Sequence, residues 1–174
     1  GGSLLSKIWK GLGEFYRLGL IERFETKIYA AQAKGCSPVV TAIKENSEII
    51  KPVNPETIAK SLAIGNPADG YYALKTVKES GGWGEEVSDE EIIEGMKLLA
   101  RTEGIFTETA GGVTVAATRK LIEQGRISRD ELVVISITGN GLKTQEAVAE
   151  RIGKPIRIKA NLASFERKMK EMRK

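Results

Sequence analysis

The sequence contains no histidine and only one cysteine, Cys36, among its 174 residues. Without histidine the chain offers no Ser-His-Asp triad, no Cys-His pair and not the commonest protein ligand of zinc. A single cysteine excludes an internal disulfide and suits a reducing compartment, so we expect a cytoplasmic protein. Any chemistry must therefore come from other side chains or from a bound cofactor.

The sequence also lacks a run of about 20 apolar residues, the length that a membrane-spanning helix needs. Hydrophobic residues make up 41% of the chain and charged residues 29%, with only 5 prolines. This composition is typical of a globular domain, and a chain of this length can build a core without disulfides or metals. We therefore expect no membrane partner and no metal site.

Positive charge is concentrated at the carboxyl-terminal end. The net charge is +4, but residues 151–174 alone carry nine Lys or Arg against Glu166 and Glu171, which leaves −3 on residues 1–150. Phe165 is the one aromatic residue of the basic segment, whereas nucleic-acid-binding faces combine basic and aromatic side chains. We interpret residues 1–150 as the main domain and residues 151–174 as a solvated basic strand-helix tail, with a polyanion site as the alternative. We expect no nucleic-acid partner.

Helical and strand periodicities alternate along the chain. Helices are predicted over residues 4–15, 37–46, 54–64, 68–80, 88–104, 113–125 and 161–174, and strands over residues 27–32, 132–138 and 154–160. The strand LVVISIT (132–138) has no charge and is predicted to be buried on both faces. Strands separated by helices indicate an α/β fold, with a mostly parallel sheet flanked by helices.

Local signals support several helix starts. Ser88 followed by Glu91 is a capping box, and Gly104 ends the helix that it begins. Asn54 and Pro55 have the residue types of an N-cap and a first helical turn, which predicts the helix over 54–64.

Three glycine-containing turns are candidate binding sites, because ligands of open α/β sheets gather at the carboxyl ends of strands. Gly1-Gly2-Ser3 precedes a helix, where free N–H groups and the helix dipole suit a phosphate; the alternative is a cloning linker, since no methionine begins the sequence. In TGNG (138–141) we expect the hydroxyl of Thr138 to point into a crevice at the end of a buried strand, and Gly139 and Gly141 to let a flat ring approach. The alternative is a tight turn in which the threonine bonds to the backbone.

Glu108, in the turn ETAGG, is either a pocket carboxylate or the N-cap of the next helix. Cys36 is expected to be a small buried hydrophobic residue, and Trp9 and Trp83 are expected to pack.

Five motifs in order resemble the carboxyl-terminal half of the threonine synthase family, pyridoxal-phosphate enzymes of the tryptophan-synthase-β fold. They are GGSLLSKIWKG, AAQAKGCSPVVTAI, TIAKSLAIGNPADGYYAL, EEIIEGMKLLARTEGIFTETAGGVTVAA and VVISITGNGLKT. The resemblance covers residues 1 to about 147 and favours a natural origin for the GGS turn. The G-N-P and G-L-K pieces favour threonine synthase over threonine dehydratases, which share other motifs.

The resemblance implies a lobe of a fold-type-II enzyme that converts O-phospho-L-homoserine and water to L-threonine and phosphate. It assigns the cofactor phosphate to Gly1, Gly2, Ser3 and Leu4, and the cofactor ring to Thr138, Gly139, Asn140 and Gly141. It places Glu108 with Thr109 and Ala110 in the pocket, and Asn66, in the G-N-P turn, is either structural or orients the pocket wall. The family's Schiff-base lysine lies in an amino-terminal half that this sequence lacks, so no catalytic residue is assigned and the chain alone is expected to be inactive.

The resemblance also implies a homodimer for the complete enzyme. Two alternatives remain: another fold-type-II enzyme, such as a threonine dehydratase or a cysteate synthase, and a free-standing α/β binding module without catalysis.

Overall fold

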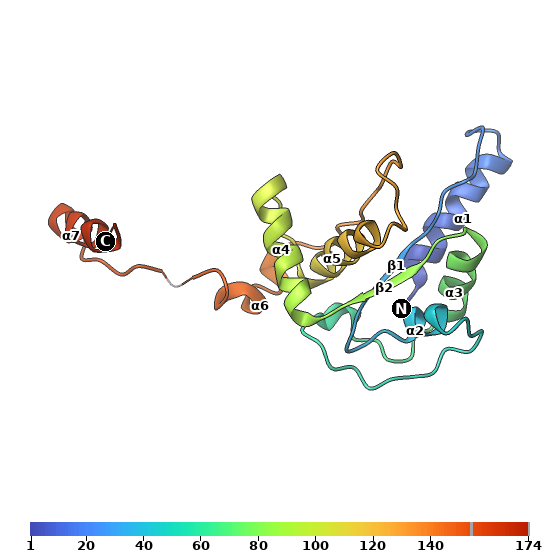
Figure 1. Cartoon of the computed structure of the whole chain (residues 1–174), viewed down its shortest axis with the longest axis horizontal. Coiled ribbons are helices and arrows are strands. Elements are labelled where there is room, and N and C mark those ends of the chain that lie inside the picture. The colour runs from blue at the N-terminus through green and yellow to red at the C-terminus, as the bar shows by residue number, and fades with distance from the viewer. Residues whose placement is uncertain (154, 174) are drawn as a thin grey trace.

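A parallel pair of strands organises the fold, with helices on both of its faces (Figure 1). The computed structural model describes residues 1–153 and 155–173. Strand β1 (Ala30–Ala33) lies beside β2 (Gly84–Val87), with Ala30 opposite Gly84 and Ala33 opposite Val87. The predicted α/β class with parallel strand pairing is confirmed.

Helices of the amino-terminal part cover one face and later helices cover the other. Helices α1 (Ser3–Arg17), α2 (Pro38–Lys44) and α3 (Gly70–Glu79) belong to the first group, and α4 (Asp89–Glu103) and α5 (Thr109–Glu123) to the second. Successive side chains of a strand point to opposite faces. Accordingly, Ala30 packs with α2 and α3, whereas Ala33 packs with α4 and α5.

The start and end signals of α4 are confirmed. The Ser88 hydroxyl accepts a hydrogen bond from the Glu91 N–H at 3.3 Å, and the Glu91 carboxylate accepts one from the Ser88 N–H at 2.7 Å. Gly104 takes the left-handed conformation, with a φ of 68°, directly after the helix. A short local motif was enough to predict this helix because its contacts lie within its own first turn.

The predicted helix over 54–64 is wrong. Only a 3₁₀ turn, η1 (Lys60–Leu62), forms there. The Val53 N–H donates to the Gly65 carbonyl at 3.0 Å, and the Glu56 N–H donates to the Gly35 carbonyl at 2.9 Å. These bonds to other segments replace the i to i−4 bonds of a helix, despite the favourable residue types of Asn54 and Pro55.

The predicted strands over 132–138 and 154–160 do not form among the described residues. Residues 132–138 are irregular and have no strand beside them there; Leu132 is 96% exposed and Val134 87% exposed, so the predicted burial on both faces is also wrong. A strand needs a hydrogen-bonded neighbour, and β1 and β2 pair only with each other in the described sheet. Residues 155–160 are likewise irregular, and Lys154 lies outside the described residues.

Short elements complete the chain. They are η2 (Gly141–Lys143), α6 (Glu146–Ala149) and α7 (Leu162–Met172). Helix α7 confirms the predicted last helix, and its Asn161 cap accepts a hydrogen bond from the Ser164 N–H at 2.9 Å. Strand β2 was not predicted, because its sequence GEEV carries two acidic residues in four positions.

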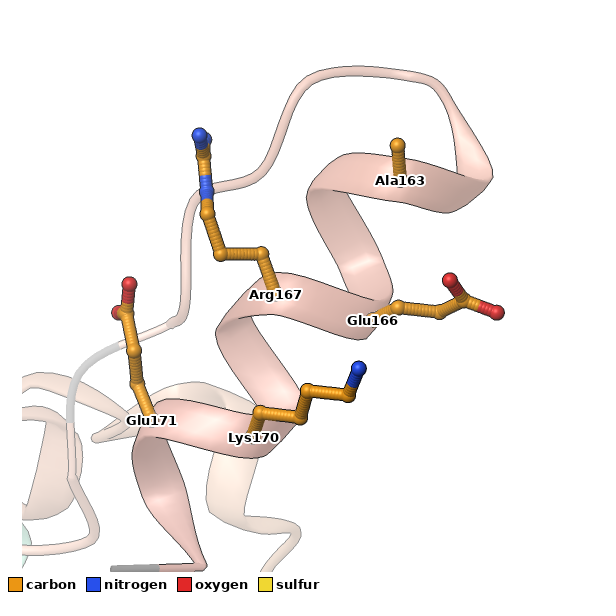
Figure 2. A pocket seen from close by; sticks show the side chains of 5 residues that line it. All are labelled: Ala163, Glu166, Arg167, Lys170 and Glu171. Atoms are coloured by element: carbon orange, nitrogen blue, oxygen red, sulfur yellow. The ribbon is translucent and has the colours of Figure 1, made fainter.

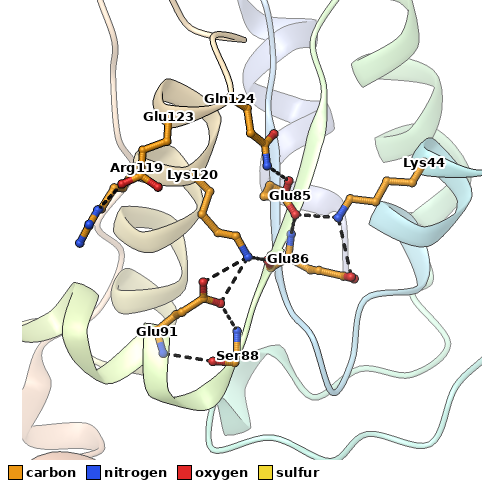
Figure 3. A network of polar contacts seen from close by, with 9 residues as sticks. All are labelled: Lys44, Glu85, Glu86, Ser88, Glu91, Arg119, Lys120, Glu123 and Gln124. Carbon is orange, nitrogen blue, oxygen red and sulfur yellow. Dashed lines mark hydrogen bonds and ion pairs between the residues drawn. The ribbon is translucent and has the colours of Figure 1, made fainter.

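The acidic residue Glu85 of β2 is buried and links both helical layers (Figure 3). Its carboxylate accepts hydrogen bonds from Lys44 Nζ on α2 at 2.6 Å, from Gln124 Nε2 beside α5 at 2.7 Å, and from the Glu86 N–H at 2.8 Å. Burial favours the neutral acid, but these three donors outweigh it and lower the pKa of Glu85 from 4.5 to about 2. The carboxylate therefore stabilises the fold in its ionised form.

We expect Glu85→Gln to lower the free energy of unfolding at pH 7 by roughly 3 kcal/mol, because each unit of pKa shift is worth about 1.4 kcal/mol. Since the folded-state pKa is depressed, the contribution is complete above pH 4.5 and is lost as the pH falls through about 2. Urea unfolding of both proteins between pH 2 and 7 measures this. Their stabilities should converge at the acidic end.

Glu123→Gln is the matched control for this prediction. Glu123 pairs with Arg119 at 2.7 Å, but both side chains are more than half exposed. An exposed pair of this kind is worth about 0.5 kcal/mol or less. A loss at pH 7 no larger for Glu85→Gln than for this control would contradict the role given to Glu85.

Candidate functional site

The amino terminus of α5 lies toward the carboxyl edge of the two strands. Val113, in the second turn of α5, packs in one cluster with Ala33 and Val87, the last residues of β1 and β2. Gln124, just after α5, reaches back to Glu85 near the start of β2. Helix α5 therefore runs antiparallel to the strands, and its first residues lie at the edge where α/β proteins bind ligands.

Two turns that are distant in sequence form one hydrogen-bonded unit at that edge. The Glu108 N–H donates to the Gly139 carbonyl at 3.0 Å, and the Gly141 N–H donates to the Phe106 carbonyl at 2.9 Å. The Thr107 hydroxyl also donates to the Gly139 carbonyl, at 3.1 Å. The structure thus brings together the ETAGG and TGNG turns.

Glu108 is a buried carboxylate, 4% exposed, at the N-cap position of α5. Glu108 therefore occupies the N-cap position, as the alternative predicted, but its side chain makes no capping hydrogen bond. One carboxylate oxygen lies 3.4 Å from Lys143 Nζ. The other lies against Gly139, where an added Cβ would come within 1.9 Å of it.

Close packing explains why residues 139 and 141 are glycines, which the sequence did not reveal. A Cβ at Gly141 would lie 2.6 Å from the ring of Phe106, as a Cβ at Gly139 would meet Glu108. Asn140, between them, caps η2 by accepting a hydrogen bond from the Leu142 N–H at 2.9 Å. The expected contacts of these three residues with a cofactor ring stay predictions.

The hydroxyl of Thr138 makes no hydrogen bond within the described part of the chain, and the residue is exposed. The backbone-bonded turn that we considered as an alternative is therefore not found for this threonine. Its position directly before the unit of residues 106–109 and 139–144 leaves the hydroxyl available to a ligand.

The GGS turn is packed into the fold at the amino terminus of α1. Gly2 has a φ of 90°, which favours glycine, and an added Cβ would lie 2.7 Å from the Asp69 carbonyl. The Asp69 N–H donates to the Gly1 carbonyl at 3.0 Å. Packing of this kind is not expected of a flexible cloning linker.

The start of α1 has the free donors that an anion requires. The first intrahelical bond runs from the Ser6 N–H to the Gly2 carbonyl, and no side chain caps the helix. The N–H groups of Ser3, Leu4 and Leu5 precede that bond and have no acceptor within the helix. Together with the helix dipole they suit a phosphate, and the contact of Gly1, Gly2, Ser3 and Leu4 with a cofactor phosphate stays a prediction.

Sequence analysis missed two residues of this region. Lys143 and Thr144 follow TGNG directly, and the Thr144 hydroxyl accepts a hydrogen bond from the Thr109 N–H at 3.1 Å. The Thr109 hydroxyl itself is buried and has no hydrogen-bond partner among the described residues. The charge and the hydroxyl in G-L-K-T were the available signal for Lys143 and Thr144.

The other single residues behave largely as expected. Cys36 is buried, and burial raises the pKa of its thiol, so it acts as a small hydrophobic residue. Trp9 packs on Phe24, with ring centroids 5.2 Å apart. Trp83 packs against the cluster formed by α2 and α3. The Arg126 guanidinium also lies over its ring, 3.7 Å from the centroid, and this contact was not predicted. Asn66 is exposed, and its structural role stays a prediction.

The basic tail presents mixed charges. A shallow hollow of about 380 Å³ on α7 is lined by both acidic and basic side chains (Figure 2): Ala163, Glu166, Arg167, Lys170 and Glu171. Lys168 pairs with Glu171 at 2.9 Å on the same helix. This arrangement favours the solvated helix over a polyanion site.

The described residues contain no helix long and apolar enough to cross a membrane. Nor do they contain a group of three or more Cys, Asp or Glu side chains arranged to hold a metal ion.

A family model described as "Pyridoxal-phosphate dependent enzyme" matches residues 1–139. The chain therefore belongs to the pyridoxal-phosphate-dependent enzyme family. It is similar to the threonine synthase of Methanocaldococcus jannaschii, with 43% identity over 169 residues, or 97% of this chain and 42% of that protein. The threonine synthase of Methanosarcina acetivorans is 43% identical over 91% of this chain and 39% of its own length.

A solved threonine synthase from Escherichia coli shares the fold, with a TM-score of 0.57 at 15% identity over 84% of this chain and 37% of that one. The chain spans about two fifths of the length of the relatives it matches. The alignment with the M. jannaschii protein, unlike the family model, extends into residues after 150.

We expect Gly139→Ala to displace the Glu108 carboxylate, because the added methyl group cannot share its space. The free energy of unfolding should fall by about 1–3 kcal/mol, the usual cost of overpacking. Ser136→Ala, at an exposed position three residues earlier, should change it by less than about 0.5 kcal/mol. Urea unfolding of the three proteins tests this, and equal stability of all three would show that Glu108 is not confined by Gly139.

Proposed function

We propose that the protein is a threonine synthase, which converts O-phospho-L-homoserine and water to L-threonine and inorganic phosphate with pyridoxal phosphate. The observation that carries this proposal is the 43% identity with the M. jannaschii threonine synthase over 97% of the chain. Two features support it: the N–H groups at the start of α1 and the Thr138 hydroxyl, which have no hydrogen-bond partner in the part of the chain that the structure describes. The proposal includes a cytoplasmic location and an organisation into residues 1–150, part of the catalytic domain, and a tail of residues 151–174.

Bound pyridoxal phosphate supplies an electron sink for negative charge that develops on the substrate. In this proposal the backbone N–H groups of Ser3 and Leu4, with the Ser3 hydroxyl, donate to the cofactor phosphate. Gly1 and Gly2 shape the turn that exposes those donors, and the dipole of the 15-residue helix α1 favours the negative charge.

Thr138 is proposed to place its hydroxyl at the pyridine nitrogen. A hydroxyl is neutral, so it holds the ring without requiring a proton on that nitrogen, as a carboxylate would. This moderates the electron sink and disfavours transamination. Gly139, Asn140 and Gly141 would form a wall beside the ring.

Glu108 is proposed to line the pocket together with Thr109 and Ala110. Its carboxylate is buried and faces Lys143 and Gly139, so its position is held from two sides. A charge fixed in this way contributes to an electrostatic environment that needs no reorganisation when a ligand binds.

The lysine that binds the cofactor is proposed to lie in an amino-terminal half outside these 174 residues, and the chain alone is proposed to be inactive. The exposed apolar residues Leu132 and Val134 support the existence of such a partner. Their segment has the composition of a buried strand and no strand neighbour among the described residues. The complete enzyme is proposed to be a homodimer.

Another fold-type-II enzyme remains the second candidate, because the residues that would select the substrate are proposed to lie largely in the amino-terminal half, outside these 174 residues. The experiment that separates the two uses the complete natural protein with pyridoxal phosphate and O-phospho-L-homoserine. We expect phosphate and threonine in equal amounts. Formation of 2-oxobutanoate from threonine without phosphate release from O-phospho-L-homoserine would instead identify a dehydratase.

A complete protein without a cofactor-binding lysine would favour the non-catalytic binding module. Absorbance of the protein with added pyridoxal phosphate, before and after borohydride reduction, measures whether such a lysine is present.

We expect Thr138→Asp in the complete enzyme to reduce threonine formation by about 10- to 100-fold and to raise the share of transamination, because the carboxylate favours a protonated ring nitrogen. Thr138→Ser keeps the hydroxyl and should retain most of the activity. Parallel assays of threonine and of pyridoxamine phosphate measure both effects. Unchanged rates and product ratios for Thr138→Asp would remove this residue from the site.

A further inference from the structure

Helix α1 carries an exposed stripe of apolar side chains, and the proposed cofactor site uses only the backbone N–H of its first member, Leu4. Its members are 42–72% exposed although all are large and apolar: Leu4, Ile8, Phe15 and, directly after the helix, Leu18. Another side of α1 is already occupied, since Leu5, about 100° round the helix from Leu4, packs against the cluster formed by α2 and α3. The stripe is therefore a second apolar face of the same helix. Isolated exposed apolar residues are common, but a continuous row marks an interaction surface.

The spacing of the row is that of a helix-pairing seam. With Gly11 included, positions 4, 8, 11, 15 and 18 alternate steps of four and three residues, which is the heptad pattern of packed helices. A Cβ added at Gly11 would meet nothing within 4 Å. The middle of the seam is thus open, and another backbone can approach closely there.

Two opposite charges lie beside the seam, one before Gly11 and one after it. Lys7 and Glu14 are seven residues apart, so they lie on the same side of the stripe, two turns from each other. Lys7 precedes Gly11 by four residues, and Glu14 follows it by three. Glu14 also forms an ion pair with Lys10 within the helix, with Lys10 Nζ 2.9 Å from Glu14 Oε1.

We infer that this stripe, Leu4, Ile8, Gly11, Phe15 and Leu18, is the contact surface for α1 of a second copy of the protein. The two helices run antiparallel about a two-fold axis at Gly11.

In that arrangement Leu4 meets the partner's Leu18, and Ile8 meets the partner's Phe15 to within about one residue. The side of the stripe that carries Lys7 and Glu14 faces the same side of the partner, as two-fold symmetry requires. Lys7 therefore lies beside the partner's Glu14, and this pair occurs twice. A parallel arrangement does not bring these two charges together, so charge complementarity selects the antiparallel one.

This inference names the surface of the proposed homodimer and does not depend on the reaction that the enzyme catalyses. The rest of the complete protein is the other possible cover of the stripe, and the experiment below separates the two. If the rest of the protein covers the stripe, substitutions in the stripe should destabilise the fold and leave the dimer dissociation constant unchanged.

The test uses the complete protein, loaded with pyridoxal phosphate, and measures the dimer dissociation constant by sedimentation equilibrium. Lys7→Glu places two acidic residues at each of the two symmetric contacts, and Glu14→Lys places two basic residues there. Each single change should weaken the dimer about tenfold. The double variant Lys7→Glu/Glu14→Lys restores opposite charges and should recover the original constant within about threefold.

Ile8→Glu is a stronger probe, because it introduces a charge into the apolar seam twice. It should weaken the dimer by about 100-fold or more. Lys75→Glu on α3, an exposed position outside the stripe, is the control and should leave the dimer constant unchanged. Circular dichroism of every variant shows whether it is folded.

The inference is overturned if folded Ile8→Glu keeps the dimer constant of the original protein, or if the complete protein is a monomer. Failure of the double variant to recover when both single variants weaken the dimer overturns the antiparallel orientation. Threonine formation, assayed on the same samples, reports on the proposed function separately. Absence of that activity in a dimeric protein would reject the reaction and leave the dimer surface standing.

Discussion

One buried carboxylate, that of Glu85, connects the layers of this fold. A two-stranded parallel sheet with four-residue strands has little area on which to hold helices. Glu85 adds directional bonds to that small area, since it joins Lys44 of α2 on one side and Gln124 after α5 on the other. A buried charge is unfavourable unless its donors are in place, so the pair of strands and both neighbouring helices must be assembled together. This cooperativity positions α5, and through it the turn that begins with Glu108.

The candidate site depends on that placement. Helix α5 runs back along the strands, which brings its first residues to the carboxyl edge, where the Glu108 turn bonds to Gly139 and Gly141. The site is therefore built by backbone hydrogen bonds between segments about 30 residues apart, with the side chains of Glu108 and Phe106 filling the space above two glycines. Both glycines serve close packing within the protein, whatever ligand lies beside them.

Sequence reasoning succeeded where the determining contacts are local. The box of Ser88 and Glu91 and the stop at Gly104 specify α4 within a few residues, and the α/β class follows from alternating periodicities. It failed where distant contacts decide, as in residues 54–64, where the bonds of Val53 to Gly65 and of Glu56 to Gly35 hold the backbone out of a helix. It missed β2 because the charged residues Glu85 and Glu86 interrupt the hydrophobic pattern from which a strand is predicted. For the site, residue types identified the three glycine turns, but not that Gly139 packs on Glu108 or that Lys143 pairs with it.

The apolar residues that remain exposed are of two kinds, and each kind requires a different cover. Leu132 and Val134 lie in an irregular segment, so burial of their side chains alone would leave backbone N–H and C=O groups without partners. Another strand satisfies both needs, and a helix does not. In α1 the backbone bonds are already made within the helix, so the stripe around Gly11 needs only side-chain packing, which a second helix supplies. The strand segment therefore points to the rest of the same enzyme, whereas the helix stripe requires only a second helix, which we infer to be α1 of a second copy.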